Sequence, residues 1–178
     1  MQDLQLLDLQ KFRDDRGWFC EIHNAEKYRK LGIECDFVQD NQSFSRSAGT
    51  LRGLHLQMHP MSQAKLVSCS KGEIFDVAVD LRLGSATFGR WKGFNLSAAN
   101  GKQLFVPEGF AHGFVTLTDD TEVFYKCSSL YDPKSERAVR WDDSDLNIVW
   151  PINSNPILSK KDAEAKSLKD LVRELKPL

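Results

Sequence analysis

The chain lacks the features that mark several common classes of protein. Its four cysteines are widely spaced and form no CxxC pair, which favours reduced, structural thiols over a disulfide framework. The 24 basic residues nearly cancel the 25 acidic residues, so no excess of one charge attracts a nucleic acid or a membrane surface. No stretch approaches the ~20 apolar residues of a membrane span, and the N-terminus has neither the basic start nor the apolar core of a signal peptide. We therefore expect a cytoplasmic protein without nucleic-acid or membrane partners.

The glycine-rich loops that bind nucleotide phosphates are also missing. The chain contains no Walker loop and no GxGxxG segment, and residues 84–89 are too irregular for a dinucleotide fingerprint. Any nucleotide would therefore be held by side chains rather than by a helix N-terminus. One candidate is Asp14–Glu21, with Phe12 before it, because an arginine among aromatic residues suits a phosphate and a stacked base. The same segment is also typical of a solvated turn that leads into a strand.

Strand patterns dominate the chain. Residues 65–69 and 73–81 flank Ser70–Gly72, and this arrangement predicts a β-hairpin. In its second arm the odd-numbered residues from Phe75 share one face and the even-numbered residues from Ile74 share the other. Further strands are predicted for segments separated by Gly, Pro and Asp turns: 91–96, 102–107, 111–117 and 122–127.

Helix patterns are few. Residues 26–31 predict a short helix ended by Gly32. Ser159 followed by Asp162 resembles a capping box, which would begin a C-terminal helix carrying Leu168, Leu171, Val172 and Leu175. Many short strands at close spacing predict one all-β domain over residues 1–178, in the form of a sandwich, a jelly roll or a barrel. Such folds bind ligands in the mouth between sheets, where inward polar side chains line the site.

The most informative segment is Leu51–Gln57. It places His55 among apolar residues, close to the fixed charge of Arg52 and to the flexible Gly53. Histidine exchanges a proton near neutral pH because its unperturbed pKa is about 6.5. No cofactor loop or ligand cluster nearby gives this histidine another task, so the segment points to proton transfer without a cofactor. A core histidine that only satisfies a hydrogen bond is the structural alternative.

A second segment, Pro107–His112, resembles the second half of the cupin metal motif through its Pro-x-Gly-x-x-His spacing. The first half of that motif needs a His-x-His pair, but Gln57 stands where the second histidine would be. His59 lies four residues after His55, a spacing for a helix face, and Pro60 argues against a helix there. Too few ligands converge for a tightly bound catalytic metal, and we expect neither a metal nor a cofactor.

Two further side chains suit proton chemistry at a carbon atom. Tyr125 faces the same way as Val123 and Cys127 in its predicted strand, and a phenol with an unperturbed pKa of about 10 donates a proton when held near a reacting carbon. Lys65 shares a predicted face with apolar residues of its own strand, and an ammonium in a cavity stabilises a developing oxyanion. A core tyrosine with a satisfied hydroxyl and a solvated edge-strand lysine are the structural alternatives.

Several blocks of the chain occur together, in a fixed order and over nearly its whole length. They are Asp15–Gly17, Phe37–Asn41, Leu51–His55, Gln63–Val67, Phe75–Asp80, Pro107–Phe114, Tyr125–Lys126, Glu136, Trp150–Pro151 and Leu158–Asp162. Jointly they resemble the dTDP-4-dehydrorhamnose 3,5-epimerase family. The resemblance implies an all-β, cupin-like jelly roll (a double-stranded β-helix) with a few short peripheral helices, assembled as a homodimer.

The resemblance also implies a reaction that uses no metal or cofactor. Its substrate is a dTDP-4-keto-6-deoxyhexose, whose protons at C3 and C5, alpha to the ketone, are removed and returned on the opposite face. The implied conversion is that of dTDP-4-dehydro-6-deoxy-D-glucose to dTDP-4-dehydro-L-rhamnose, the precursor of dTDP-L-rhamnose. Two proton carriers on opposite faces of the sugar are what such an inversion requires.

Carried over by position, the resemblance assigns roles to individual side chains. His55 is the implied general base, and Asp162 is the partner that holds its ring and stabilises the imidazolium. Tyr125 is the implied acid on the other face, and Lys65 stabilises the enolate oxygen. The implied substrate contacts are Arg16, Glu21, Gln39, Asp40, Asn41, Arg52, His112, Glu136 and Lys161. Tyr131 matches the position that stacks on the thymine ring.

Three features of the sequence qualify the resemblance. Leu130 stands where many relatives have a second tyrosine, and Leu56 stands where an aromatic residue is frequent; both would reshape the pocket. In a regular strand Arg52 and His55 face opposite sides, so both serve one site only if the chain bulges or twists near Gly53.

Other functions fit the same motifs. One is an epimerase that inverts a single carbon or takes another sugar nucleotide. Another is a sugar-nucleotide binding module without activity, against which the joint presence of His55, Asp162 and Tyr125 argues. The third is a metal-dependent cupin enzyme.

Overall fold

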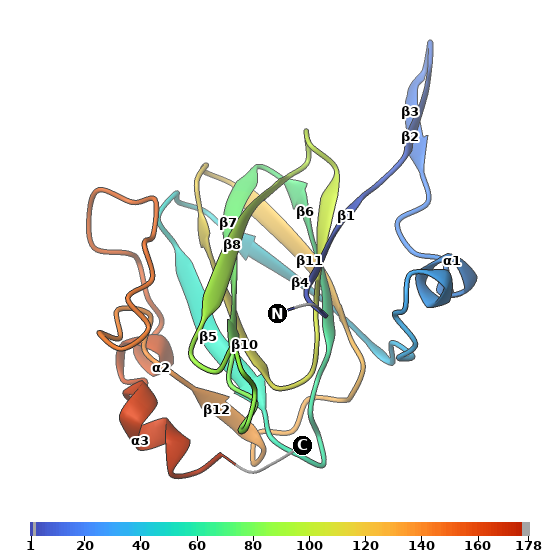
Figure 1. Cartoon of the computed structure of the whole chain (residues 1–178). Coiled ribbons are helices and arrows are strands. Elements are labelled where there is room, and N and C mark those ends of the chain that lie inside the picture. Colours follow the sequence, from blue (N-terminus) through green and yellow to red (C-terminus); the bar gives the residue numbers. More distant parts are fainter. Residues whose placement is uncertain (2, 176–178) are drawn as a thin grey trace.

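Two five-stranded antiparallel sheets packed face to face make up the body of the protein (Figure 1). The computed structural model describes residues 1 and 3–175. The first sheet has the order β1 (Gln5–Asp8), β9 (Lys102–Val106), β6 (Lys65–Lys71), β11 (Thr121–Cys127) and β4 (Gln39–Ser45). The second has the order β12 (Glu136–Ala138), β5 (Leu51–Gln57), β10 (Phe110–Thr116), β7 (Glu73–Asp80) and β8 (Trp91–Ser97). This architecture is a jelly roll, as the resemblance implied.

The predicted hairpin at residues 70–72 is wrong, although both of its strands exist. β6 and β7 lie in different sheets, so the turn carries the chain from one sheet to the other. Gly72 makes this corner possible because its φ is +78° and a Cβ there would lie 2.5 Å from the hydroxyls of Thr118 and Thr121. The local sequence predicted the turn correctly but carried no information about which strands β6 and β7 pair with.

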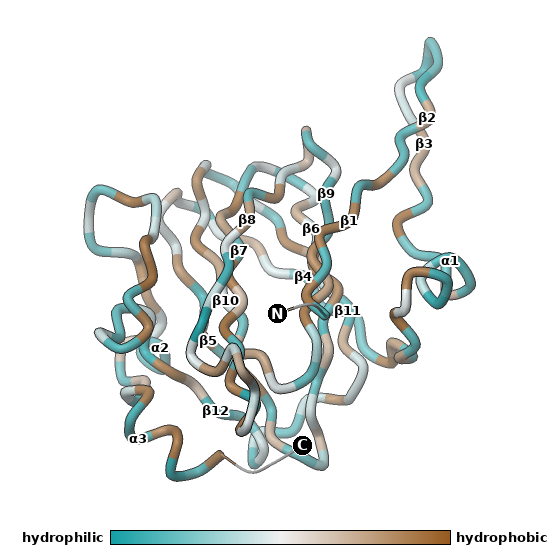
Figure 2. Tube along the Cα trace, viewed as in Figure 1, coloured by the Kyte–Doolittle hydropathy of each residue, from teal (hydrophilic) through white to brown (hydrophobic). Residues whose placement is uncertain are grey.

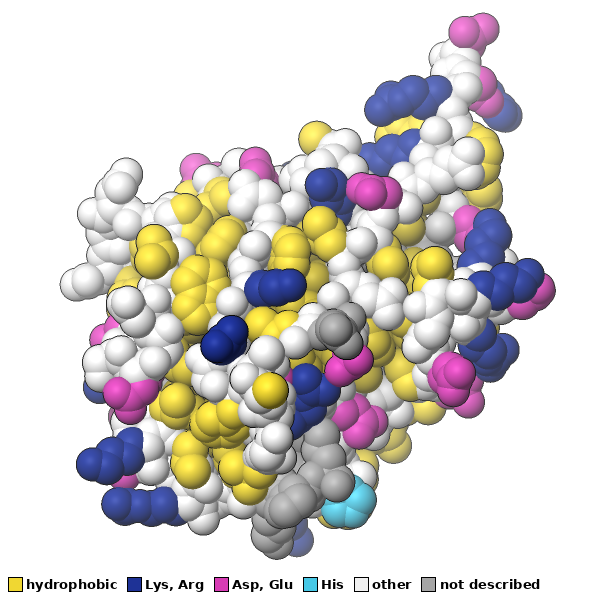
Figure 3. All heavy atoms as spheres, viewed as in Figure 1, with side chains coloured by type: hydrophobic (Ala, Val, Ile, Leu, Met, Phe, Trp, Pro, Cys, Tyr) yellow, Lys and Arg dark blue, Asp and Glu magenta, His cyan; other side chains and the backbone are white. Residues whose placement is uncertain are grey.

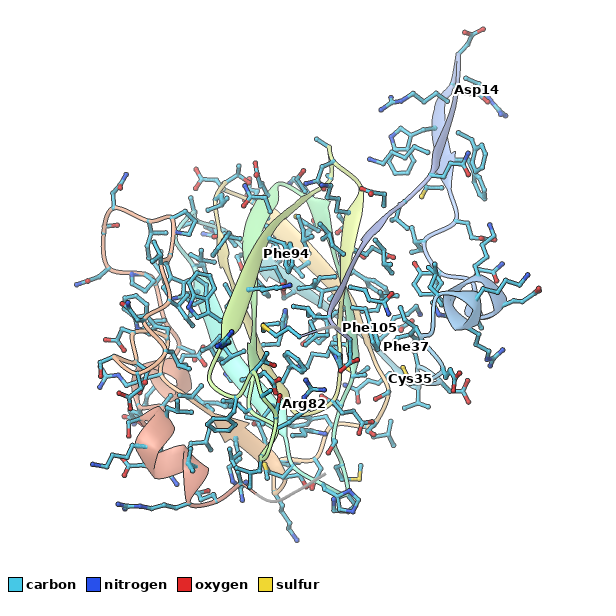
Figure 4. The ribbon with its side chains drawn as sticks, viewed as in Figure 1. Asp14, Cys35, Phe37, Arg82, Phe94 and Phe105 are labelled. Atoms are coloured by element: carbon cyan, nitrogen blue, oxygen red, sulfur yellow. The ribbon has the colours of Figure 1, made fainter. Side chains whose placement is uncertain are left out.

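The N-terminal helix forms as predicted. Helix α1 (Ala25–Lys30) begins at Asn24, whose side chain accepts a hydrogen bond from the Lys27 amide, and Gly32 follows its end with φ +82°. The hydrophobic residues Phe105, Phe37 and Cys35 gather beside it, as Figure 4 shows. No helix of the described residues is long and apolar enough to cross a membrane.

The predicted C-terminal helix is two short helices instead of one. Ser159 caps α2 (Lys160–Ala163), as its motif indicated, but Ser167 caps a separate helix, α3 (Leu168–Val172). Between them the chain turns out of the helix, because the Lys166 carbonyl accepts a hydrogen bond from the Arg140 amide at 2.9 Å. A tertiary contact therefore overrides local helix propensity.

The second sheet is covered on both of its faces. Its inner face packs on the first sheet through a cluster that includes Ile74, Ala78 and Phe114. Its outer face packs on the C-terminal segment, which contributes Trp150, Leu168 and Leu171. In Figure 2 the hydrophobic stretches accordingly follow the strands of the body.

A two-stranded arm extends away from this body (Figures 1 and 4). It consists of β2 (Lys11–Asp14) and β3 (Gly17–Cys20), which pair only with each other. Its aromatic side chains Phe12, Trp18 and Phe19 are all more than half exposed. Figure 3 shows charged side chains of both signs at its tip. The arm thus presents apolar surface that nothing else in the described chain covers.

Candidate active site

A bulge in β5 brings Arg52 and His55 to the same side of the sheet. His55 pairs with His112 and Arg52 pairs with Phe114, so three residue steps along β5 match two along β10. Gly53 takes up the extra residue at φ +122°, and a Cβ there would lie 2.5 Å from the Gly113 Cα. The alternation of side chains shifts at this point. The proposed requirement for a bulge near Gly53 is therefore confirmed.

Two adjoining hollows between the sheets form one cavity, because both are lined by His55, Lys65 and Tyr125. The first sheet supplies one wall, with Gln39, Asn41 and Ser43 from β4, Lys65 from β6 and Tyr125 from β11. The second sheet supplies the other, with Arg52 and His55 from β5, His112 from β10 and Glu136 from β12. Tyr131 and the segment around α2 (Ser159, Lys161 and Asp162) complete the lining. The histidine and the tyrosine therefore belong to opposite walls.

His55 is paired with a buried carboxylate. Its Nε2 lies 2.5 Å from Asp162 Oδ1, while Ser159 Oγ donates to Asp162 Oδ2 at 2.8 Å. Burial opposes ionisation of Asp162, but the hydrogen bond and charge of His55 prevail and hold the pKa of this carboxyl below its usual value. An ionised carboxylate only accepts hydrogen bonds, so Nε2 carries a proton and Nδ1 is left as the basic nitrogen of the neutral ring.

The opposite wall carries a phenol and an ammonium. Burial raises the pKa of Tyr125, with smaller contributions from its neighbours, so its hydroxyl keeps its proton at neutral pH. Burial lowers the pKa of Lys65, which is only 9% exposed. Its ammonium makes one long hydrogen bond of 3.5 Å, to the carbonyl of His55. A poorly solvated cation of this kind is available to stabilise a negative oxygen in the cavity.

His112 is held from behind by a second buried carboxylate. Both oxygens of Asp76 lie 3.0 Å from His112 Nε2, and Asp76 is completely buried on β7. Arg52 is anchored differently, through the Phe44 carbonyl at 3.0 Å and the Ser45 hydroxyl at 3.3 Å. Each polar side chain of this wall is thus fixed before any ligand arrives.

Three of the predicted contact residues contact one another at the mouth of the cavity. Glu136 accepts a hydrogen bond from the Tyr131 hydroxyl at 2.9 Å and forms an ion pair with Lys161. Burial alone would raise the pKa of Glu136, but the bonds from Lys161 and Tyr131 outweigh it and lower that pKa. This group therefore joins the segment after β11 to the start of α2.

Three other predicted contacts lie outside this cavity. Arg16 sits at the tip of the arm, where its side chain is 90% exposed and pairs with Asp14. Glu21 lies at the base of the arm and bonds Lys27 and Asn24. The side chain of Asp40 points to the outer face of β4, where it pairs with Lys126. Because side chains alternate along a strand, the neighbours of Asp40 line the cavity and Asp40 does not.

Several lining residues were absent from the prediction. The sequence indicates Ser159 only as a helix cap, and it indicates Asp76, which lies behind the lining and holds His112, only as a strand residue. The sequence assigns no role in the site to Gln57, Gln63 or Ser43, because their roles depend on segments far along the chain. Among the residues that the structure describes, no three His, Cys, Asp or Glu side chains converge in a way that could hold a metal ion.

Comparison with known proteins gives a consistent result. The family model for dTDP-4-dehydrorhamnose 3,5-epimerase matches residues 1–170. The chain is 49% identical over 167 residues to the dTDP-4-dehydrorhamnose 3,5-epimerase of Salmonella typhimurium, covering 93% of this chain and 91% of that protein.

Comparison with solved structures indicates the same family. The dTDP-6-deoxy-D-glucose-3,5-epimerase of Legionella pneumophila, in complex with dTDP-4-keto-L-rhamnose, superposes with a TM-score of 0.95 at 46% identity, covering 99% of this chain and 94% of that one. The dTDP-4-dehydrorhamnose 3,5-epimerase of Bacillus anthracis, with TDP and PPi bound, gives a TM-score of 0.91 at 49% identity, covering 93% and 94%. The jelly roll and its polar cavity thus define a sugar-nucleotide epimerase. More particularly, the chain belongs to the dTDP-4-dehydrorhamnose 3,5-epimerase family.

Proposed function

We propose that this epimerase inverts C3 and C5 of dTDP-4-dehydro-6-deoxy-D-glucose with His55 as base and Tyr125 as acid. The observation that supports this assignment best is their position on opposite walls of one cavity, on β5 and β11. A proton removed from one face of a ring carbon and replaced from the other inverts that carbon. One carrier on one side would mostly restore the original isomer.

Each inversion is a pair of proton transfers. Nδ1 of His55 takes the proton on the carbon alpha to the ketone, and the electrons of that C–H bond move toward the C4 oxygen to form an enolate. Asp162 stabilises the resulting imidazolium through the bond at Nε2. Lys65 stabilises the enolate oxygen. The hydroxyl of Tyr125 then gives its proton to the opposite face of the carbon, and exchange with solvent restores both side chains.

The remaining contacts suit a dTDP group. We assign Arg52 and His112, on the second sheet, to the polar part of the ligand, with Gln39, Asn41 and Lys161 nearby. Tyr131 stands at the mouth, half exposed, with its ring available to a base. In this assignment the keto sugar lies beside His55, Lys65 and Tyr125.

The test is to incubate the protein with dTDP-4-dehydro-6-deoxy-D-glucose in D2O and follow it by NMR. Deuterium should enter at both C3 and C5, and the product should have inverted configuration at both. Deuterium at one ring position only would contradict the double inversion and favour a single-site epimerase. His55→Ala should abolish exchange while dTDP still binds; exchange at the parental rate would refute the choice of base.

We further propose that the enzyme is a homodimer in which the arm of each protomer reaches the cavity of the other. The arm exposes three aromatic side chains and carries Arg16 and Glu21, which match substrate-contact positions yet lie outside their own cavity. A second copy of the chain would cover the apolar surface and bring these charges to a ligand.

Subunit mixing tests this arrangement directly. Arg16→Ala and His55→Ala should each be inactive as pure dimers. In a mixed dimer, one cavity receives the intact His55 and the intact Arg16, so mixing should recover about a quarter of the parental sites. No recovery, in protein shown to exchange subunits, would place the arm's action within its own protomer.

We also propose that the enzyme acts in the cytoplasm. All four of its cysteines are free thiols, which suits a reducing compartment.

A further inference from the structure

The segment that carries Tyr131 is held by glutamine side chains rather than by a strand ladder. Residues 129–132 follow the end of β11, and each of their peptide units is bonded to an amide group from another part of the chain. Gln63 donates to the Ser129 carbonyl at 2.7 Å, and Gln39 accepts from the Tyr131 amide at 2.8 Å. The backbone that carries the tyrosine is therefore held by side chains that line the same cavity, and its hydroxyl is held by Glu136.

Gln57 is the centre of this arrangement. Its Oε1 accepts from the Asp132 amide at 2.7 Å, and its Nε2 donates to the Leu130 carbonyl at 3.1 Å. Nε2 also donates to the Met61 carbonyl, at 2.6 Å. The side chain thus bonds the residues on both sides of Tyr131 and ties them to the loop after β5.

Burial makes this role specific to an amide. Gln57 is only 4% exposed, and it uses one acceptor and both donors of its amide on three backbone groups. A residue of similar size without those groups would leave two carbonyls and one amide without their partner. The backbone groups of residues 129–132 would then bond to water instead, and the segment would no longer have one fixed conformation.

We propose that Gln57 is a positioning residue for nucleotide recognition, which holds Tyr131 in the orientation that receives the base. It touches neither the reacting carbons nor the proton carriers in this scheme, so it acts on binding and not on proton transfer. The inference rests on the proposed function in one respect, namely that Tyr131 contacts the base.

The experiment combines Gln57→Met with Tyr131→Ala in a double-mutant cycle. Binding of dTDP is measured by calorimetry, and KM and kcat are measured with the keto sugar. Gln57→Met should weaken dTDP binding about tenfold, or about 1.4 kcal/mol, because binding must then order the segment. KM should rise in parallel, while kcat stays within about threefold of the parental value. In the Tyr131→Ala background, Gln57→Met should have no further effect on dTDP binding.

Thr116→Val is the matched control. Thr116 is also buried and also bonds a distant loop, through the Ser47 carbonyl and the Thr50 amide, but that loop carries no predicted contact residue. The control should lower the unfolding midpoint and leave dTDP affinity unchanged. A general effect of lost stability is thereby separated from an effect on Tyr131.

Two outcomes would overturn the inference alone. One is parental dTDP affinity in folded Gln57→Met, and the other is an equal loss of affinity with and without the Tyr131 ring. If Tyr131→Ala itself leaves dTDP affinity unchanged, the base contact is wrong, and the role of Gln57 falls with it. Should Gln57→Met fail to fold, Gln63→Met removes only the Ser129 bond and must show the same dependence on Tyr131.

Discussion

Replacing Asp162 by asparagine tests the pairing on which the chemistry depends. The substitution keeps the shape of the side chain and removes its charge. Asp162 is 3% exposed and lies 2.5 Å from His55 Nε2, so solvent does not replace the charge that is lost. Removal of one hydrogen bond to a charged group costs about 1.5–3 kcal/mol, and this cost is felt when His55 becomes an imidazolium. Each 1.36 kcal/mol is a factor of ten in rate, so kcat should fall by about 10- to 150-fold.

The hydroxyl of Ser159 limits the loss. If it accepts a hydrogen bond from the new amide, the amide oxygen still faces Nε2 and the ring keeps its basic Nδ1. If the amide is rotated by half a turn, its NH2 group faces Nε2 of His55. The ring then carries its proton on Nδ1, the nitrogen that should act as the base, and kcat falls by about 10⁴-fold.

The assay is deuterium exchange at C3 and C5 in D2O, with dTDP affinity measured beside it. Exchange should fall by about 10- to 150-fold, and the affinity for dTDP should not change. Asp143→Asn is the control, since Asp143 is also buried but bonds the backbone of Leu146 and Leu168 away from the cavity. Parental exchange in Asp162→Asn, or an equal loss in the control, would refute the reasoning.

Three further predictions concern the acid, the lysine and the bulge. Tyr125→Phe should retain exchange of solvent deuterium on the face of His55 but reduce inverted product by about 10²- to 10⁴-fold, measured by NMR; inversion at the parental rate would exclude Tyr125 as the acid. Burial lowers the pKa of Lys65 below its ordinary 10.5, while the pKa of Tyr125 is raised above 10. Because the ammonium is the active form, kcat should fall as pH rises through that lowered pKa, and Lys65→Arg should move this limb to higher pH; an unmoved limb would contradict the role. Gly53→Ala places a Cβ 2.5 Å from the Gly113 Cα and 2.7 Å from the His112 carbonyl, and should cost about 3 kcal/mol of unfolding free energy together with activity. Gly84→Ala, at φ +82° with open space around it, should cost only about 1 kcal/mol in the same denaturant titration; equal costs would show that the clash is unimportant.

The sequence predicted strands β6 to β11 because alternation is a local property. The two faces predicted for β7 are those observed, with Phe75, Val77 and Val79 in the outer core and Ile74 and Ala78 between the sheets. The faces that alternation gives Tyr125, shared with Val123, and Lys65, shared with Val67, are the faces that point between the sheets.

The predictions that failed are those that depend on contacts between segments far apart in the chain. The turn at Gly72 was predicted, but the pairing of its strands depends on β9, β10 and β11, which follow later in the chain. The C-terminal helix breaks because Lys166 bonds a residue 26 positions away. Similarly, the role of Gln57 could not be predicted, because Leu130 and Asp132 lie far along the sequence.

Anchoring base and acid on separate sheets has a consequence for the enzyme under stress. Hydrogen bonds such as the long one from Lys65 Nζ to the His55 carbonyl cross between the sheets, but the space between the sheets is filled mainly by apolar side chains, including Phe114 and Val123. Heat that loosens this packing would move the two proton carriers apart before the strands of either sheet separate. Turnover should therefore cease while the strands are still intact, and the temperature limit of activity should lie below that of the fold.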